Sequence, residues 1–175
     1  MMLLDKYNYC PVCGSQKFIA NSEKSKVCGD CGFELFMNPS SANAAIITNE
    51  QGEMLVVRRK KEPAKGTLDL PGGFADVQET VEEGVCREVK EETGLHVTRA
   101  EYLFSLPNQY VYSGLTIPTL DLFFRCHVDN ITDLKASDDA AECLWIPIKE
   151  VNPADFGLHS IRKGVEKYIR KLKRE

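Results

Sequence analysis

Residues 73–95 read GFADVQETVEEGVCREVKEETGL, and this stretch carries the strongest local signals in the chain. Thr80 and Glu83 have the Thr-x-x-Glu spacing of a helix capping box, and Gly94 is a typical residue for the end of a helix. The spacing predicts a helix that begins just after Thr80 and ends at Gly94. Directly upstream, Pro71-Gly72-Gly73 predicts a sharp break in the chain.

Three glutamates gather on one face of this predicted helix. At about 100° per residue, they fall within about 100° of arc, and they are Glu88, Glu91 and Glu92. The three carboxylates repel one another unless solvent separates them or they share cations. Oxygen clusters of this kind suit hard divalent ions such as Mg²⁺. On charge alone, a metal site and a solvated acidic face are equally good interpretations.

The full pattern resembles the signature of the Nudix hydrolases. That signature has glycine, five residues, glutamate, seven residues, and then Arg-Glu-aliphatic-x-Glu-Glu-x-Gly-aliphatic. Its specified places are filled here by Gly73, Glu79, Arg87, Glu88, Val89, Glu91, Glu92, Gly94 and Leu95. The preceding Leu70-Pro71-Gly72-Gly73 is also similar to that family. Residues from about 39 to 175 fit the usual span and strand order of its domain.

This resemblance implies an α/β fold, an α/β/α sandwich around a mixed sheet. In that fold, the helix and the loop before it hold divalent metals against a diphosphate. The metal, Mg²⁺ or Mn²⁺, would be bound by the backbone carbonyl of Gly73 and by the carboxylates of Glu88, Glu91 and Glu92. Arg87 would pair with carboxylates and orient them. Glu79 would either bind metal through water or brace the loop.

The reaction implied by the resemblance is hydrolysis of a nucleoside diphosphate linked to another group. A metal-activated water attacks phosphorus while the metals neutralise the leaving phosphate. The general base stays open on the sequence. Glu91 and Glu92 are candidates inside the motif. Asp139 and Glu142, just before a later strand, are candidates outside it, and a plain polar strand edge explains that pair equally well.

Four of the seven cysteines form two Cys-x-x-Cys pairs, Cys10 with Cys13 and Cys28 with Cys31. Four thiolates suit tetrahedral Zn²⁺, and an iron–sulfur cluster is the alternative. This segment has too few aliphatic residues for a core of its own, so it needs a metal to fold. We expect a small zinc ribbon at residues 1–37 and a Nudix domain at residues 38–175. The zinc either only folds the ribbon or also brings it into contact with a ligand.

A four-cysteine ribbon joined to this domain resembles the zinc-ribbon branch of the family, which includes NADH pyrophosphatases. After the motif that branch carries Ser-Gln-Pro-Trp-Pro-Phe-Pro-x-Ser, and this chain has SLPNQYVYS at residues 105–113. Ser105, Pro107 and Ser113 agree, but the tryptophan and two prolines are missing. NADH, ADP-ribose and FAD are therefore comparable candidate substrates. Tyr110 and Tyr112 either stack on a base or flavin ring or pack within the sheet.

Charge and hydropathy narrow the classes of partner. With 43% hydrophobic residues, 27% charged residues and a mean hydropathy of −0.28, the composition is that of a soluble globular protein. Apolar runs fall far short of the ~18 residues of a membrane span, so we expect a cytoplasmic protein without a membrane partner. A net charge of −4 argues against general nucleic-acid binding.

A capped RNA 5′ end remains as the nucleic-acid alternative to a small-molecule nucleotide substrate. A non-catalytic ligand-sensing protein is the third class, and a homodimer is left open. Arg58 lies in a basic run, RRKK at residues 58–61, that either meets the charge of a diphosphate or is simply solvated.

The rest of the chain reads as strands followed by one helix. Strand-like segments occur at residues 42–48, 53–59, 95–105, 120–128 and 142–146, and the turn at 49–52 predicts a hairpin between the first two. The tail from residue 158 onward is an amphipathic helix with an apolar stripe at Leu158, Ile161, Val165, Ile169 and Leu172. Its basic side is interpreted as a solvated face rather than a nucleic-acid site.

Overall fold

The computed structural model of the chain describes residues 3–136 and 140–174. The chain divides into two compact units, Met1–Ser40 with Gln109–Pro118, and Ser41–Asn108 with Thr119–Glu175. Within the described part of the chain, no helix is long and apolar enough to cross a membrane.

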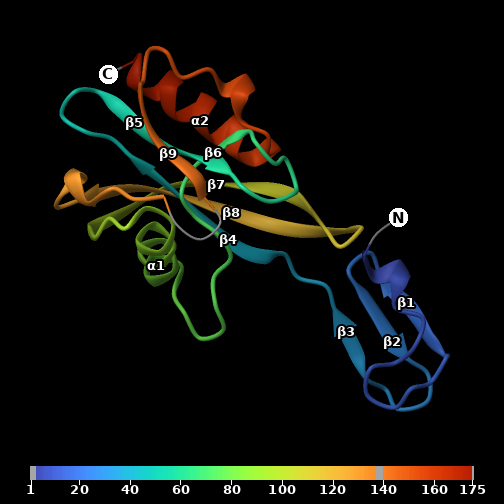
Figure 1. Cartoon of the computed structure of the whole chain (residues 1–175). Helices are drawn as coiled ribbons and strands as arrows, with labels where there is room; N and C mark the ends of the chain where they lie inside the picture. Colours follow the sequence, from blue (N-terminus) through green and yellow to red (C-terminus); the bar gives the residue numbers. More distant parts are fainter. Residues whose placement is uncertain (1–2, 137–139, 175) are drawn as a thin grey trace. The chain divides into compact units, whose positions relative to one another are not determined.

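The first unit contains a small antiparallel sheet in the order β1-β2-β3 (Figure 1). Its strands are β1 (Phe18–Ser22), β2 (Ser25–Cys28) and β3 (Glu34–Phe36), and a short 3-10 helix covers Leu3–Lys6. The buried residues of this unit's core are Cys10, Phe18 and Cys28, with Phe33 and Leu35 packed against them. A core of this size is too small to stabilise the segment alone.

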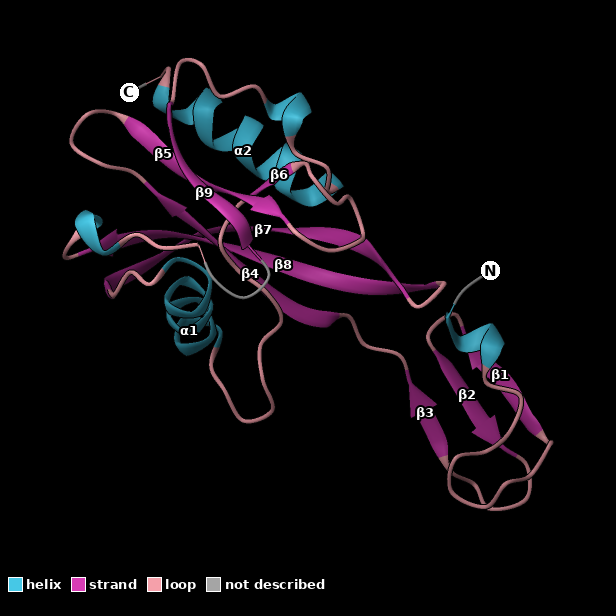
Figure 2. Ribbon diagram, in the orientation of Figure 1, coloured by secondary structure: helices cyan, strands magenta, loops and turns pink. Residues whose placement is uncertain are grey.

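The other strands among the described residues form two three-stranded sheets, ordered β4-β8-β7 and β6-β5-β9 (Figure 2). Most of their residues belong to the second unit, and the adjoining ends of β7 and β8, within Gln109–Pro118, belong to the first. The strands are β4 (Ser40–Ile47), β5 (Glu53–Arg59), β6 (Leu68–Asp69), β7 (Val97–Tyr112), β8 (Leu115–Val128) and β9 (Ala140–Pro147). The α-helices are α1 (Val81–Thr93) and α2 (His159–Leu172), and short 3-10 helices cover Ile131–Asp133 and Pro153–Asp155.

The expected hairpin is present only at its turn. The backbone N–H of Asn49 donates to the carbonyl of Glu53, and Thr48 bridges antiparallel to Met54. Beyond the turn the strands diverge, because β4 pairs with β8 while β5 pairs antiparallel with β6 and β9. A parallel bridge joins Leu68 to Phe156, so both kinds of pairing occur, as expected of a mixed sheet.

Consecutive residues of the central strands point to opposite faces and build two separate cores. On β4, Ala44 and Ile46 belong to the core closed by α2, while Ala45 and Ile47 belong to the core closed by α1. The helices therefore cover opposite faces of the strands (Figure 1). This arrangement confirms the predicted α/β/α sandwich.

Helix α2 packs through the apolar stripe that the sequence predicted. Ile161 and Val165 are buried, and the remaining stripe residues are partly buried against the same core. Gly164 makes the approach to β8 close, since a Cβ there would lie 2.2 Å from a ring carbon of Phe123. Tyr168, which the stripe did not include, is 3% exposed and belongs to the same core.

Candidate active site

Helix α1 has the ends that the sequence predicted. The Thr80 hydroxyl accepts from the backbone N–H of Glu83 at 3.2 Å, and the Glu83 carboxylate accepts from the backbone N–H of Thr80 at 2.9 Å. At the other end Gly94 takes a left-handed conformation with φ of 74°, and its N–H donates to the carbonyl of Lys90 at 3.0 Å. These caps fix the helix that carries the glutamates.

The loop before α1 is held on strand β4 by backbone hydrogen bonds. The N–H of Asn43 donates to the carbonyl of Gly73 at 2.8 Å, and the N–H of Ala45 donates to the carbonyl of Pro71 at 2.7 Å. A Cβ at Gly72 would lie 2.2 Å from the Asn43 carbonyl oxygen, and a Cβ at Gly73 would lie 2.5 Å from Oε1 of Glu88. The two glycines therefore let the loop pass against both β4 and a carboxylate of α1.

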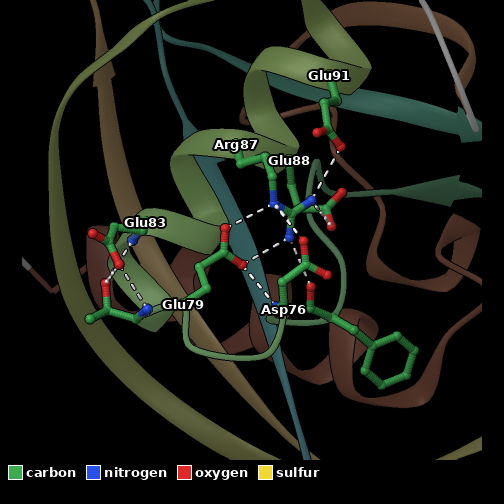
Figure 3. A network of polar contacts seen from close by, with 8 residues as sticks. Asp76, Glu79, Glu83, Arg87, Glu88 and Glu91 are labelled. Atoms are coloured by element: carbon green, nitrogen blue, oxygen red, sulfur yellow. Dashed lines mark hydrogen bonds and ion pairs between the residues drawn. The ribbon is translucent and has the colours of Figure 1, made fainter.

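Arg87 lies at the centre of a network of carboxylates (Figure 3). Its Nε and Nη2 donate to the two carboxylate oxygens of Glu79 at 2.9 and 3.0 Å. Its Nη1 donates to Glu88 at 2.9 Å and to Glu91 at 3.2 Å, and Nη2 also donates to the carbonyl of Phe74 at 3.1 Å. One guanidinium thereby fixes a loop residue and two glutamates of α1.

The same network separates the pKa values of its carboxyl groups. Hydrogen bonds from Arg87 and from the backbone N–H of Asp76 lower the pKa of Glu79 from 4.5 to about 2. The pKa of Glu88 is raised, because burial outweighs the contact with Arg87. The pKa of Arg87 is raised by its hydrogen bond to Glu79, so the guanidinium stays charged. A partly desolvated carboxylate beside other carboxylates is a group that a bound cation would stabilise.

Glu92 is held separately from the arginine-centred network. It is 8% exposed, and its Oε2 accepts from the backbone N–H of Gly72 at 3.1 Å. Its backbone carbonyl accepts from the thiol of Cys143 on β9 at 3.7 Å. Glu92 thus connects α1 with the glycine loop on one side and with a strand on the other.

The donor atoms of the glycine loop and of α1 fit a hard divalent ion. The backbone of Gly73 lies against the carboxylate of Glu88, and the side chain of Glu91 is 47% exposed. These groups supply only oxygen atoms, which are the ligands that Mg²⁺ and Mn²⁺ prefer. Arg87 binds one carboxylate oxygen of Glu88 and one of Glu91 in this structure, and a carboxylate has two oxygens, so each can contact arginine and an ion together.

Two residues expected near the site from other strands contact each other. Arg58 on β5 and Glu142 on β9 face each other in the strand register, and the Nε of Arg58 donates to Glu142 at 3.0 Å. Arg58 also donates to the carbonyl of Gly66 at 3.1 Å. Asp139, the other candidate base, lies outside the described residues. Tyr110 and Tyr112 lie on β7 within the first unit, and Tyr112 is 61% exposed.

The sequence interpretation missed Asn43, a buried polar residue on β4 behind the glycine loop. Its side chain is 4% exposed, and neither its amide nitrogen nor its amide oxygen has a hydrogen-bond partner among the described residues. The nitrogen lies 3.0 Å from the position that a Cβ of Gly84 on α1 would take. A buried amide without a protein partner is a typical place for a bound water. The only sequence signal was one amide within an otherwise small and apolar strand.

A second polar cluster that the sequence did not indicate is buried on the α2 side. Arg59 forms an ion pair with Asp69, and burial raises the pKa of that carboxyl group. Asp121 on β8 accepts hydrogen bonds from Asn108, Thr119 and Ser160. These contacts join residues from distant parts of the sequence, and they give the two buried carboxylates hydrogen-bond donors.

The four paired cysteines come together in the first unit. The Sγ atoms of Cys10 and Cys31 are 3.7 Å apart, those of Cys13 and Cys28 are 3.5 Å apart, and all four Sγ atoms lie within 4.8 Å of one another. Backbone N–H groups of Cys31 and Asp30 lower the pKa of Cys28 to about 6. Four sulfur atoms gathered in this way could hold a metal ion.

Comparisons with known proteins agree with this geometry. Residues 37–168 match the NUDIX domain. The ADP-ribose pyrophosphatase of Methanocaldococcus jannaschii is 36% identical over 139 residues, which cover 75% of this chain and 75% of that protein. The NAD-capped RNA hydrolase NudC of Vibrio parahaemolyticus is 26% identical over 83% of this chain, which spans about half (53%) of that relative.

Among solved structures, a NUDIX hydrolase from Nitrosomonas europaea superposes with a TM-score of 0.74 at 21% identity, covering 94% of this chain and 91% of the other. At that identity the likeness shows the fold. The sequence match covers most of the chain and includes the capped helix, the glycine loop and the arginine-centred carboxylates. On these grounds the chain belongs to the NUDIX domain family.

Proposed function

We propose that the protein is a metal-dependent enzyme that hydrolyses the diphosphate linkage of a nucleoside diphosphate derivative, with ADP-ribose as the first candidate substrate. The observation that carries the proposal is the carboxylate network around Arg87, set against the glycine loop on a NUDIX domain. The 36% identity to an ADP-ribose pyrophosphatase supports that substrate. NADH and FAD belong to the same chemical class.

In this proposal Mg²⁺ or Mn²⁺ is held by the Gly73 carbonyl together with Glu88, Glu91 and Glu92. The bound ion supplies positive charge to the diphosphate and lowers the pKa of a coordinated water. Gly72 keeps Glu92 in position by donating its N–H to the carboxylate. Glu79, ionised because its pKa is about 2, keeps Arg87 in place when Glu88 and Glu91 bind the ion.

Two carboxylates are candidates to accept the proton of the attacking water. Glu91 is half exposed, whereas Glu92 is buried and bound to Gly72, so Glu91 is the more accessible candidate within α1. Glu142 is the candidate outside the helix, and it is released for this role only when Arg58 turns from it. Arg58 would do so by moving its guanidinium onto a substrate phosphate.

We also propose that residues 1–37 form a zinc ribbon and residues 38–175 the NUDIX domain. A tetrahedral site with Zn–S bonds of ~2.3 Å has sulfur–sulfur edges of about 3.8 Å. The observed distances of 3.5 and 3.7 Å are close to that value. Elemental analysis should find stoichiometric zinc in the wild type and a loss of zinc in Cys13→Ser. The control Cys86→Ser, outside the cluster, should keep its zinc, and unchanged zinc in Cys13→Ser would contradict the proposal.

A second candidate function is hydrolysis of a nucleotide-capped RNA 5′ end. The NudC relative, named for NAD-capped RNA, matches 83% of the chain. In either function Tyr110 and Tyr112 are proposed to contact the base or nicotinamide end of the substrate. Arg58 is proposed to contact the diphosphate.

A substrate panel tests the proposal. ADP-ribose, NADH, FAD, an NAD-capped oligonucleotide and nucleoside triphosphates are compared by kcat/KM with Mg²⁺ and with Mn²⁺. We expect ADP-ribose or a dinucleotide to give the highest value and chelation to abolish turnover. A nucleoside triphosphate with the highest kcat/KM would overturn the substrate assignment. Absence of turnover on every substrate would overturn the enzyme assignment.

A further inference from the structure

A groove of about 650 Å³ in the second unit is lined by the edge strand β7 and by helix α2. Leu103, Phe104 and Leu106 of β7 supply its apolar floor. Exposed basic side chains of α2 supply most of its rim, which also includes Glu166 in an ion pair with Arg170. The groove is within the range of ~300–1,000 Å³ that small-ligand pockets occupy.

The basic rim follows one face of α2. Lys163, Lys167, Lys171 and Arg174 are spaced by four, four and three residues, so successive turns place them in a single stripe. Residues 159–174 carry seven basic side chains and one acidic side chain, in a chain whose net charge is −4. Attraction to the helix dipole accounts for basic residues in the last turn but not for Lys163 and Lys167. Like charges at this spacing cost helix stability, which an anionic ligand would recover.

The floor of the groove presents an aromatic ring beneath one of these cations. Phe104 stacks on Phe123 with ring centroids 4.9 Å apart and planes inclined by 26°. On Phe104 the ammonium of Lys167 lies 4.2 Å from the ring centroid. Aromatic rings bordered by Lys and Arg hold unpaired bases together with their phosphates in many proteins. A base stacked on Phe104 would take the place of the Lys167 ammonium, which would then contact a phosphate.

Other occupants fit this groove poorly. The apolar face of α2, with Ile161, Val165 and Tyr168, is buried in the core and cannot insert into a lipid surface. A second copy docked on the same face would bring two basic stripes together, which opposes a dimer there. The charge instead complements a polyanion with exposed rings.

We propose that the groove between α2 and β7 binds single-stranded RNA, with phosphates on the basic stripe and a base on the floor beside Phe104. This inference rests on the proposed function, in which a capped RNA is one substrate of the diphosphate site.

Fluorescence anisotropy tests the binding directly. The probe is a single-stranded RNA of about 12 nucleotides, labelled at its 3′ end, and the protein is the full chain. The double variant Lys163→Glu/Lys167→Glu should weaken binding about tenfold or more and reduce its salt dependence. The control Lys135→Glu/Lys149→Glu makes the same change of net charge at exposed positions outside the groove, and it should change affinity by less than about twofold. Lys167→Met keeps the aliphatic stem over Phe104 and should give an intermediate loss.

The outcomes separate this inference from the proposed function. Selective loss in the groove variants supports the inference, and their kcat/KM for ADP-ribose should stay unchanged. Equal loss in groove and control variants, or no RNA binding by the wild type, overturns it. Binding to phosphatidylserine vesicles in place of RNA also overturns it. A wild type that binds RNA through the groove but hydrolyses no diphosphate would contradict the proposed function and leave the groove assignment standing.

Discussion

Helices α1 and α2 have nearly the same length, 13 and 14 residues, and cover opposite faces of the same strands with opposite charge (Figure 1). The charged side chains of the two helices differ in burial. In α1, carboxylates surround Arg87, whose side chain is 26% exposed, and Glu92 is only 8% exposed. In α2 the basic side chains are exposed, and the buried residues are apolar or small apart from Ser160 and Tyr168.

The comparison indicates that burial and hydrogen-bond partners, rather than the density of charged residues, distinguish the helix that carries the proposed metal site. Glu83 and Glu88 on α1, and Glu79 just before it, have altered pKa values because a guanidinium, backbone N–H groups and desolvation act on them. Helix α1 also has a complete capping box, whereas α2 has no side-chain hydrogen bond at its first cap. We infer that α1 is built to place carboxylates and α2 to close a core, while the basic side chains of α2 are exposed to solvent.

The sharpest test of the comparison is Glu92→Gln on α1. The amide keeps the shape of the side chain and an oxygen that accepts from Gly72, but it removes one negative charge from the proposed metal site. Turnover of ADP-ribose should fall about 100-fold or more, equivalent to ~2.7 kcal/mol of transition-state stabilisation. The Tm should barely change, because removing the repulsion from Glu88 one turn away offsets small packing losses.

The matched control is Glu82→Gln, an exposed glutamate in the first turn of the same helix. Its turnover should stay within about twofold of the wild type. Both variants are measured across a Mg²⁺ titration. If Glu92→Gln keeps full turnover at ordinary Mg²⁺, Glu92 is not a required ligand and the contrast between the helices loses its basis.

On α2 the largest expected effect is on stability, from Gly164→Ala. The new Cβ would lie 2.2 Å from the buried ring of Phe123, so helix or strand has to shift. We expect a net loss of about 2 kcal/mol in the free energy of unfolding, after allowing for the better helix propensity of alanine. Lys173→Ala, at an exposed position, should change it by less than about 0.5 kcal/mol. Urea unfolding measures both, and an unchanged midpoint for Gly164→Ala would show that α2 is not closely packed.

Local signals account for the parts of the molecule that the sequence predicted well. The bounds of α1 depend on contacts within four residues, such as Thr80 with Glu83 and Lys90 with Gly94, and these are readable from spacing. The apolar stripe of α2 likewise follows from the spacing of apolar residues at the helical repeat. The family resemblance implied that Arg87 pairs with carboxylates, and two of its partners, Glu88 and Glu91, lie within four residues of it on the same helix.

Long-range pairings account for what the sequence could not predict. Arg58 and Glu142 are 84 residues apart and meet only because β5 pairs with β9. The separation of β4 and β5 into two sheets also depends on distant partners, which no turn signal encodes. The groove forms only because β7 lies beside α2. The sequence shows the basic stripe without this strand, so the stripe was interpreted as a solvated face. The burial of Asn43 could not be predicted either, because it depends on the glycine loop that packs against β4.

The smallest expected effect is a change in stability when the glutamate of a glutamate–arginine pair is replaced. The two pairs compared are Glu79 with Arg87 at the site and Glu166 with Arg170 on α2. Their shortest contacts are similar, 2.9 and 2.6 Å, but the glutamate side chains are 14% and 45% exposed. An exposed pair four residues apart contributes at most about 0.5 kcal/mol, so Glu166→Gln should hardly alter stability at any pH. Glu79→Gln removes a carboxylate whose pKa is lowered to about 2, and it should destabilise more at neutral pH.

The pH dependence gives this prediction its sign. A carboxyl group whose pKa is lower in the folded protein contributes stability above its unfolded pKa and loses that contribution as the pH falls through its folded pKa. For Glu79 the contribution is therefore complete above pH 4.5 and disappears between pH 4.5 and about 2. The difference in Tm between wild type and Glu79→Gln should be largest at neutral pH and shrink across that window. A difference that stays constant down to pH 2, or one that Glu166→Gln reproduces, would mean that the arginine network stabilises α1 no more than an exposed pair stabilises α2.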